Sequence, residues 1–373
     1  MGGPLRVLHV VVNMNRGGAE TLIMNLYRNI DRSKVQFDFL TCKKGVFDEE
    51  IEEMGGKIHR IPYVTDVGHR RYIKSLQKFF QENQNYPIVH SHMDKMSGFV
   101  LKAAKHADIP VRIAHSHNTS SEGRAGAKLY KWYAGKQVSA AATEMYACSN
   151  SAAYWLFKKK AASAHILKNG IEQQKFSFTT SIREKVRSSL GIKKDILLLG
   201  HVGRFSLQKN HRFLLEVFAE YRKRNPHSKL MLVGEGDLKE KIMDKVKELQ
   251  IEKDVLMLGV RSDIHELLQA MDVFLFPSFH EGLPVTLIEA QGAGIPCVIS
   301  DRISEEVDMG VDLIKQLPIS PVSLPSWLDE IDRTSNGQRN PIPSAPFNEK
   351  GYNINHTATN IQKEYLQLGG ARA

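Results

Sequence analysis

Short apolar runs alternate with stretches of helical periodicity along most of the chain. Runs bounded by polar or turn-forming residues predict buried strands, and apolar residues three or four positions apart predict helices that cover them. In the first half the predicted strands are Leu5–Val12, Phe37–Thr41, Lys57–Ile61, Ile88–Ser91 and one ending in Arg112–Asn118, and the predicted helices are Ala19–Ile30, Tyr72–Glu82 and Tyr130–Lys160. This order of elements favours a doubly wound parallel sheet.

The second half repeats the pattern and predicts a second domain of the same α/β class. A strand and turn at Ile166–Gly170 precede a boundary near Ile171, and Gln173–Lys194 is predicted to form a linker and an entry helix. Further predicted elements are strands at Ile196–Val202, Lys229–Val233, Val255–Gly259, Val273–Phe276 and Cys297–Ser300, helices at Ser262–Met271 and Asn355–Leu368, and loops around a short helix over Pro318–Pro346.

Two carboxylates frame the strand, loop and helix predicted between Asp272 and Asp301. Glu281 lies in the loop before the helix, and Glu289 lies eight residues later inside it. Backbone N–H groups at a helix start favour an anion such as phosphate. Gly282 would let a ligand approach the backbone closely. Taken alone, the two glutamates also fit a solvated helix face.

Glycines and cations after two other predicted strands suit a diphosphate. Gly17-Gly18 separates the first strand from its helix, which is the place of a phosphate-cradling turn, although a plain tight turn has the same sequence. In the second half Gly203 is followed by Arg204 and Lys209, which are five residues apart. One cation can bind phosphate through a bidentate fork and the other as a point charge, so the pair can clamp a diphosphate from two sides.

Histidines mark the ends of two predicted strands in the first half. His90-Ser91-His92 ends one strand and His115-Ser116-His117 ends another. Functional side chains gather at the carboxyl ends of strands in such sheets. A lone histidine is usually structural, and that alternative stays open for His90 and His92, but two H-S-H sequences favour a role at a site.

These motifs resemble those of glycosyltransferase family 4, whose members are retaining enzymes of the GT-B architecture. E-G-L-P-V-T-L-I-E at 281–289 is similar to the E-x7-E signature of that family, with F-P-S-F-H-E-G leading into it. G-R-x(4)-K at 203–209 and G-G-x-E at 17–20 are also similar to family sequences, and I-L-K-N-G at 166–170 resembles the strand and turn before its domain crossover. The resemblance covers nearly the whole chain and is strongest between Gly203 and Asp301.

The resemblance implies two Rossmann-like domains that face each other across a cleft. Residues 1–171 would bind the acceptor, residues 172–352 would bind a nucleoside-diphosphate sugar, and the last helix, within 353–373, would cross back onto the first domain. Glu281 would lie near the donor sugar, Glu289 would bind the ribose, and Arg204 and Lys209 would bind the diphosphate. The other donor-binding positions implied are Gly17, Gly18, Gly203, Gly234, Arg261, Gly282 and Leu283.

A histidine of the second H-S-H sequence would contact the donor sugar in this family. Both His115 and His117 fit that position, and we favour His117. The expected catalytic residues are therefore His117, Arg204, Lys209 and Glu281. The family is thought to use front-face attack by the acceptor oxygen, and the sequence shows no dedicated nucleophile.

Composition limits the cofactors that need to be considered. The three cysteines, Cys42, Cys148 and Cys297, form no C-x-x-C pair, which argues against a disulfide framework or a zinc site and fits a reducing cytoplasm. No D-x-D triplet occurs, so we expect no metal site, no cofactor beyond the donor and metal-independent transfer. The early apolar run Val7–Val12 is too short to span a bilayer.

The charge balance predicts anionic partners. The formal net charge is +10 in 373 residues, and such a balance attracts polyanions. No nucleic-acid-binding module is evident, so a diphosphate donor and an anionic membrane surface are expected. Ala152–Lys160 combines aromatic residues with a lysine run and could dock on the inner face of a membrane. A buried tryptophan beside a solvated charge run is the alternative.

The expected function is retaining transfer of a sugar from a nucleoside-diphosphate sugar, with UDP the expected nucleotide, to a glycan or lipid-linked acceptor in exopolysaccharide or cell-envelope glycan synthesis. A nucleotide-sugar 2-epimerase of the same fold and a non-catalytic sugar-nucleotide-binding protein are the alternatives. A nicotinamide oxidoreductase is disfavoured, because after Gly234-Glu235-Gly236 the third glycine position is Lys239. The donor sugar, the acceptor, the linkage and the oligomeric state cannot be read from the sequence.

Overall fold

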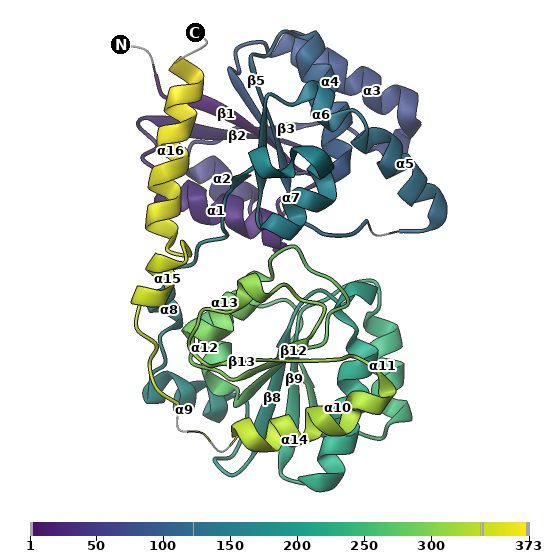
Figure 1. Ribbon diagram of the computed structural model, residues 1–373, viewed down its shortest axis with the longest axis vertical. Helices are drawn as coiled ribbons and strands as arrows, with labels where there is room; N and C mark the ends of the chain where they lie inside the picture. The colour runs from purple at the N-terminus through teal and green to yellow at the C-terminus, as the bar shows by residue number, and fades with distance from the viewer. Residues whose placement is uncertain (1–2, 122, 336, 338, 371–373) are drawn as a thin grey trace. The chain divides into compact units, whose positions relative to one another are not determined.

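The chain forms two compact units. The computed structural model describes residues 3–121, 123–335, 337 and 339–370. The N-terminal unit contains Met1–Gly170 and Gly351–Ala373, and the C-terminal unit contains Ile171–Lys350 (Figure 1). Within the described residues each unit holds one sheet in which all strand pairs are parallel.

The N-terminal unit has a 7-stranded sheet in the order β3-β2-β1-β4-β5-β6-β7. Its strands are β1 (Leu5–Val10), β2 (Val35–Thr41), β3 (Ile58–Arg60), β4 (Ile88–Ser91), β5 (Val111–Ser116), β6 (Glu144–Ala147) and β7 (His165–Ile166). Its helices are α1 (Gly18–Asn29), α2 (Asp48–Glu53), α3 (Val64–Glu82), α4 (Ser97–His106), α5 (Ala125–Gly135), α6 (Val138–Ala141), α7 (Asn150–Phe157) and α16 (Ile354–Gly370), with 3-10 turns η1 (Asp94–Met96) and η2 (Lys158–Ser163).

The core of this unit lies between the central strands and the helices that cover them. β2 is buried along its whole length, as expected for a parallel strand covered on both faces. The last helix, α16, packs on α1, β1, β2 and β4. It contributes Ile354, Ala358, Ile361 and Tyr365 to the core, although it is far from the other core residues in sequence.

One helix prediction for this unit needs correction, and another is confirmed. The helix predicted over Tyr130–Lys160 is wrong, because α5, α6 and α7 are separate helices and the strand β6 lies between the last two. The second predicted helix, Tyr72–Glu82, is part of α3, which is interrupted at Gly68, where φ is +76°. Glycine adopts this conformation at little cost, and the break separates a short first turn from the amphipathic part.

The C-terminal unit has a 6-stranded sheet in the order β10-β9-β8-β11-β12-β13. Its strands are β8 (Leu197–Val202), β9 (Ser228–Val233), β10 (Val255–Met257), β11 (Val273–Phe276), β12 (Cys297–Ser300) and β13 (Ile314–Leu317). Its helices are α8 (Gln173–Phe176), α9 (Thr180–Ser189), α10 (His211–Arg224), α11 (Lys239–Glu248), α12 (Ile264–Ala270), α13 (Val285–Gly292), α14 (Leu324–Ser335) and α15 (Ala345–Glu349), with 3-10 turns η3 (Leu207–Lys209), η4 (Glu305–Val307) and η5 (Pro321–Ser323). The sequence pattern missed β13, and α14 is longer than the short helix expected there.

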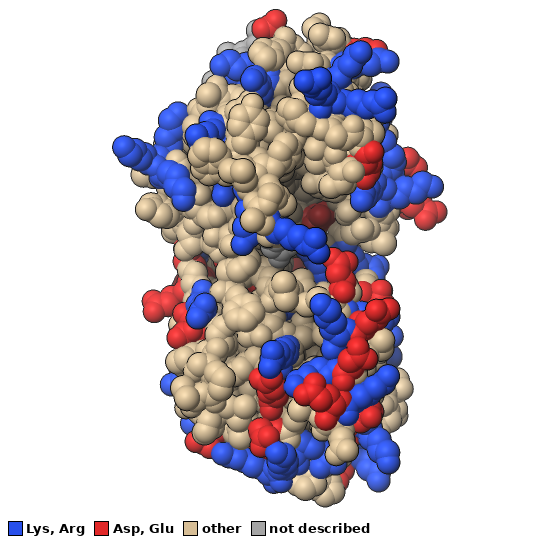
Figure 2. All heavy atoms as spheres, turned by 90° about the vertical axis from the view of Figure 1, so that its right-hand side faces the viewer, with Lys and Arg blue, Asp and Glu red and all other residues tan. Residues whose placement is uncertain are grey.

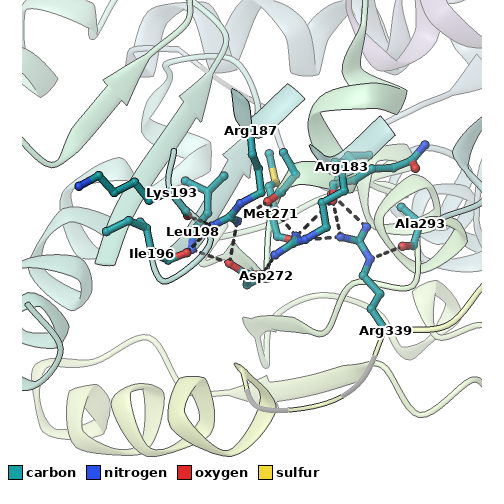
Figure 3. Close-up of polar contacts among 12 residues, drawn as sticks. Arg183, Arg187, Lys193, Ile196, Leu198, Met271, Asp272, Ala293 and Arg339 are labelled. Atoms are coloured by element: carbon teal, nitrogen blue, oxygen red, sulfur yellow. Dashed lines mark hydrogen bonds and ion pairs between the residues drawn. The ribbon is translucent and has the colours of Figure 1, made fainter. Parts of the chain in front are cut away.

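A cluster of arginines around Asp272 fixes the start of β11 (Figure 3). Arg183 and Arg187 of α9 both contact the Asp272 carboxylate, which also accepts the backbone N–H of Leu198 at 2.7 Å. Arg339 donates to the carbonyls of residues 268, 269, 271 and 293 and so satisfies the end of α12. Burial and then the neighbouring Arg183 lower the pKa of Arg339 to about 9.

No helix among the described residues combines the length and the apolar character needed to cross a bilayer.

Candidate active site

An ion pair joins two of the predicted site residues in the C-terminal unit. Lys209, at the end of η3, and Glu281, after β11, are separated by 72 residues in sequence, yet Lys209 Nζ lies 2.8 Å from Glu281 Oε1. The side chains are only 14% and 10% exposed. Lys209 Nζ also lies 4.4 Å from the centroid of the Phe276 ring, within the range of a cation–π interaction. The ammonium group is therefore held in one place before any ligand arrives.

The loops that carry Lys209 and Glu281 are bonded to each other by residues that the sequence did not suggest. The backbone N–H of Phe279 donates to the Gln208 carbonyl at 2.8 Å, and Gln208 Nε2 donates to the His280 carbonyl at 2.7 Å. Asn210 Nδ2 reaches the carbonyl of Pro277. Asn210 has φ of +52°, a left-handed conformation that asparagine tolerates better than most residues.

Two predicted donor-binding glycines lie where no larger residue fits. At Gly234, φ is +138° and a Cβ would lie 2.1 Å from the Gly203 carbonyl oxygen. At Gly203, a Cβ would lie 2.9 Å from His201 Nε2 and 3.1 Å from Lys209 Cε. The loops after β8 and β9 therefore pack backbone against backbone, and the Lys209 side chain crosses directly over Gly203.

The two arginines of the predicted site differ in what they contact. The Arg204 side chain is exposed and makes no hydrogen bond or ion pair with the residues that the structure describes. Arg261 is also exposed, but its guanidinium forms two hydrogen bonds to the Asp263 carboxylate, at 2.8 and 2.5 Å. The Arg204 guanidinium is thus available to an anion, whereas the Arg261 side chain is already engaged.

Glu289 lies on a partly exposed face of α13, within a helix that is otherwise mostly buried. Burial raises the pKa of its carboxyl group from 4.5 to about 7. Perturbed pKa values cluster at functional sites, so this shift supports a functional role for Glu289. Gly282 and Leu283, in the loop before α13, are both buried.

If Glu289 binds ribose hydroxyls, Glu289→Gln should weaken UDP binding at pH 8 by roughly 10- to 100-fold, since hydrogen bonds to a charged group contribute about 1.5–3 kcal/mol. The ratio between the wild-type and variant affinities should shrink as pH falls through about 7, because the wild-type carboxyl group then takes up a proton. Calorimetry should measure both proteins at each pH. The ionisation of UDP affects both affinities equally and therefore cancels in their ratio. A ratio that stays the same across this range would contradict the assignment.

The same variant has an opposite expected effect on stability. A carboxyl group with a raised folded-state pKa binds protons more tightly in the folded protein, so folding loses stability as pH rises from 4.5 to about 7. Glu289→Gln should therefore raise Tm at pH 8 and change it little at pH 4.5.

The predicted site residues of the N-terminal unit lie in two places, at the start of α1 and at the end of β5. Gly17 is the residue before α1, and Gly18 is its first residue, at the end of the helix where backbone N–H groups attract anions. His117 directly follows β5 and is partly exposed, whereas His115, within β5, is fully buried. This difference favours His117 over His115 as the residue that reaches a ligand, and that assignment stays a prediction.

Asp94, which the sequence did not single out, holds the loop after β5. Its carboxylate accepts the backbone N–H of His117 at 2.8 Å. Burial raises the pKa of Asp94 to about 6, although backbone hydrogen bonds oppose the shift. Asp94 itself has φ of +48°.

Comparisons with known proteins fit this arrangement. The family model described as "Glycosyl transferases group 1" matches residues 182–336, and "Glycosyltransferase Family 4" matches residues 16–175. The chain is 40% identical to the glycosyltransferase EpsF of Bacillus subtilis over 338 residues, which are 88% of each protein. The chain is a group 1 glycosyltransferase.

More distant proteins agree with the family and its GT-B fold. The capsular polysaccharide biosynthesis glycosyltransferase CapH of Staphylococcus aureus is 27% identical over 97% of this chain and 99% of its own length. The crystal structure of Anabaena Alr3699/HepE in complex with UDP and glucose has a TM-score of 0.74, 20% identity and 98% coverage of both chains. The predicted fold, two Rossmann-like domains of the GT-B class, is confirmed.

Proposed function

We propose that this glycosyltransferase moves a hexose from a UDP-sugar to a glycan or lipid-linked acceptor during polysaccharide synthesis, with retention of anomeric configuration. The Lys209–Glu281 ion pair carries the proposal, because it brings the G-R-x(4)-K and E-x7-E motifs together in one unit. Arg204, five residues before Lys209, adds an exposed cation to the same loop. As the glycosidic bond breaks, negative charge grows on the diphosphate, and fixed cations stabilise it.

The names of similar proteins support the donor and the acceptor class. A UDP-Gal:alpha-D-GlcNAc-diphosphoundecaprenol alpha-1,3-galactosyltransferase of Escherichia coli is 25% identical over 80% of this chain and 79% of its own length. The Anabaena protein mentioned above was crystallised with UDP and glucose. We therefore take UDP-hexoses as donors and polyprenyl-diphosphate-linked sugars as acceptors.

Thermal stabilisation by UDP-, GDP- and ADP-sugars should identify the donor, and product analysis then tests the reaction. We expect a new glycosidic bond only when an acceptor is present, with the anomeric configuration of the donor. Conversion of the donor to its 2-epimer without acceptor would instead identify an epimerase. Binding of the donor without any reaction would identify a non-catalytic binding protein.

Transfer should not depend on added Mg²⁺ or Mn²⁺. Lys209 and Arg204 provide the cationic charge that a divalent ion supplies in metal-dependent transferases. Activity measured after EDTA treatment should stay within about twofold of the untreated enzyme. Loss of activity with EDTA that Mg²⁺ or Mn²⁺ restores would overturn this charge-clamp mechanism.

A basic and aromatic face of the N-terminal unit supports contact with an anionic membrane. Between Gly123 and Ile171 the sequence has eight Lys or Arg residues and one acidic residue, Glu144. Four large apolar residues are exposed on α5 and α7, namely Leu129, Trp132, Tyr133 and Tyr154. Figure 2, which faces the α5 side, shows that Lys and Arg outweigh Asp and Glu on this part of the surface.

The cations of this face lie close together. Burial, followed by repulsion from Lys158, lowers the pKa of Lys95, while Asp94 opposes the shift and Lys131 adds a smaller repulsion. Lys136 Nζ lies 3.6 Å from the centroid of the Trp132 ring. Aromatic rings beside lysines suit the interface between headgroups and acyl chains.

Changing Lys158, Lys159 and Lys160 to Glu should abolish binding to vesicles that contain anionic lipid, since each basic residue near such a surface contributes about 1 kcal/mol. Binding to neutral vesicles should be weak for the wild type and the variant. The matched control changes Lys239, Lys241 and Lys247 on α11 to Glu, which alters net charge equally. Equal loss of binding in both variants would show that net charge, and not this face, is responsible.

A further inference from the structure

Five histidines of the N-terminal unit lie together at the carboxyl ends of three neighbouring strands. His9 of β1 is in register with His90 of β4. One residue separates His90 from His92 at the end of β4, and one residue separates His115 from His117 at the end of the neighbouring strand β5. Alternate residues of a strand point to one face of the sheet. The five imidazole rings therefore share one face, and neighbouring ring centroids are 4.0–5.4 Å apart.

Hydrogen bonds connect these rings in two chains. One chain runs from His9 Nδ1 to His92 Nε2 at 2.9 Å, and from His92 Nδ1 to His117 Nε2 at 2.9 Å. The other runs from the Tyr365 hydroxyl to His90 Nδ1 at 2.7 Å, and from His90 Nε2 to His115 Nδ1 at 3.1 Å. Three nitrogens of the cluster are buried and have no hydrogen-bond partner in the described part of the chain, namely His9 Nε2, His115 Nε2 and His117 Nδ1.

Buried nitrogens without partners need an explanation. Each lowers stability when it is left without a hydrogen bond, and a bound ion or water is one reason that such a cost persists. Two of the three belong to the trio His92, His115 and His117, in which one nitrogen from each residue lies within 4.8 Å of the others. Nitrogens that share one tetrahedral zinc ion lie about 3.3 Å apart. Coordination would therefore need side-chain rotations and would replace one of the two hydrogen bonds of His92.

We propose that His92, His115 and His117 form a binding site for a divalent transition metal such as Zn²⁺, Ni²⁺ or Co²⁺. Imidazole nitrogens suit these ions, whereas Mg²⁺ and Mn²⁺ prefer oxygen ligands. Three histidines leave a fourth coordination position for water or another ligand. Burial lowers the pKa of all three side chains, which keeps them neutral and able to coordinate.

This trio is favoured over a second one, His9, His90 and His92, which also meets the distance condition. All three members of the second trio are fully or nearly fully buried, whereas His117 is partly exposed. An ion can therefore reach the first trio from solvent past His117. The sequence expectation of no metal site relied on cysteine spacing and the missing D-x-D triplet, and neither would detect histidines on adjacent strands.

Titration of the EDTA-treated protein with Co²⁺ tests the site, with calorimetry for affinity and visible absorption for coordination. We expect one ion per chain in the wild type. His115→Gln should weaken binding by more than about 100-fold, because losing even an outer-shell partner of a metal ligand costs about 10- to 100-fold. The comparison variant is His9→Gln, which removes a ligand of the second trio but only a hydrogen-bond partner of His92 in the first, so it should weaken binding by no more than about 10- to 100-fold. Loss in His9→Gln with retention in His115→Gln would overturn the assignment.

Anomalous diffraction from wild-type crystals soaked in Zn²⁺ needs no variant and covers the case in which His115→Gln fails to fold. A peak among His92, His115 and His117 is expected, and peaks at other histidines alone would overturn the proposal. Coordination would also hold His117 away from a donor sugar, so Zn²⁺ should inhibit transfer reversibly; this consequence rests on the proposed function. Binding at the trio without inhibition would retain the metal site and reject the donor role of His117.

Discussion

Replacing Lys209 by alanine should lower kcat by on the order of 100-fold or more and raise KM much less. The ammonium group is held by Glu281 at 2.8 Å and by the Phe276 ring, so it needs little reorganisation when charge develops on the diphosphate. Loss of one such preorganised donor in other enzymes costs about 100- to 1000-fold in kcat. Since the leaving-group charge is greatest in the transition state, the loss should fall mainly on kcat.

Three further variants compare the charge of Lys209 with its packing and with the roles of two nearby arginines. Lys209→Met keeps an apolar stem over Gly203 and should lose as much activity as Lys209→Ala. Arg204→Lys should be less active than the wild type, because lysine keeps the charge but lacks the bidentate guanidinium group. Arg212→Ala removes an exposed cation near the start of α10, where Arg212 pairs with Glu216, and should behave as wild type. Steady-state kinetics with the identified donor measures all of them. Near-wild-type kcat in Lys209→Met would show that the lysine acts through packing alone.

The sequence predicted the C-terminal unit well because its strands are short, strongly apolar and bounded by clear turns. Val273–Phe276 and Cys297–Ser300 match β11 and β12 to the residue. The strand β6 was missed because, unlike β11 and β12, it is not a continuous apolar run: it begins with Glu144 and is only partly buried there. β13 was missed because Lys315 and Gln316, two adjacent polar residues, interrupt its apolar pattern.

The motifs located the residues of the candidate site but not their contacts. The ion pair between Lys209 and Glu281 and the support from Gln208 and Asn210 link loops that are far apart in sequence. Neither local propensity nor spacing predicts such pairs, which depend on the order of strands in the sheet. The histidine cluster shows the same limit, since both H-S-H sequences were evident but their hydrogen bonds to His9 and Tyr365 were not.

Replacing Asp272 by asparagine should destabilise the C-terminal unit by about 3–5 kcal/mol, which is the usual cost of leaving a buried charge without its partner. Its carboxylate contacts Arg183 and Arg187, the latter only 6% exposed. Asp272 lies at the start of β11, and Glu281 follows the other end of that strand, so the carboxylate supports the candidate site without belonging to it. Arg183 and Arg187 would keep their bonds to backbone carbonyls but lose this counter-charge.

Urea unfolding followed by Trp327 fluorescence measures this effect in one unit. Trp327 is fully buried in α14, and a Trp132→Phe, Trp155→Phe background removes the two tryptophans of the N-terminal unit. The matched control is Asp329→Asn, which breaks an exposed pair with Arg224 and should cost no more than about 1 kcal/mol. If Asp272→Asn and Asp329→Asn unfold at the same urea concentration, the Asp272 carboxylate adds little stability, and backbone carbonyls alone hold Arg183 and Arg187. A large difference would show that a single carboxylate balances the charge buried where α9, β8 and β11 meet.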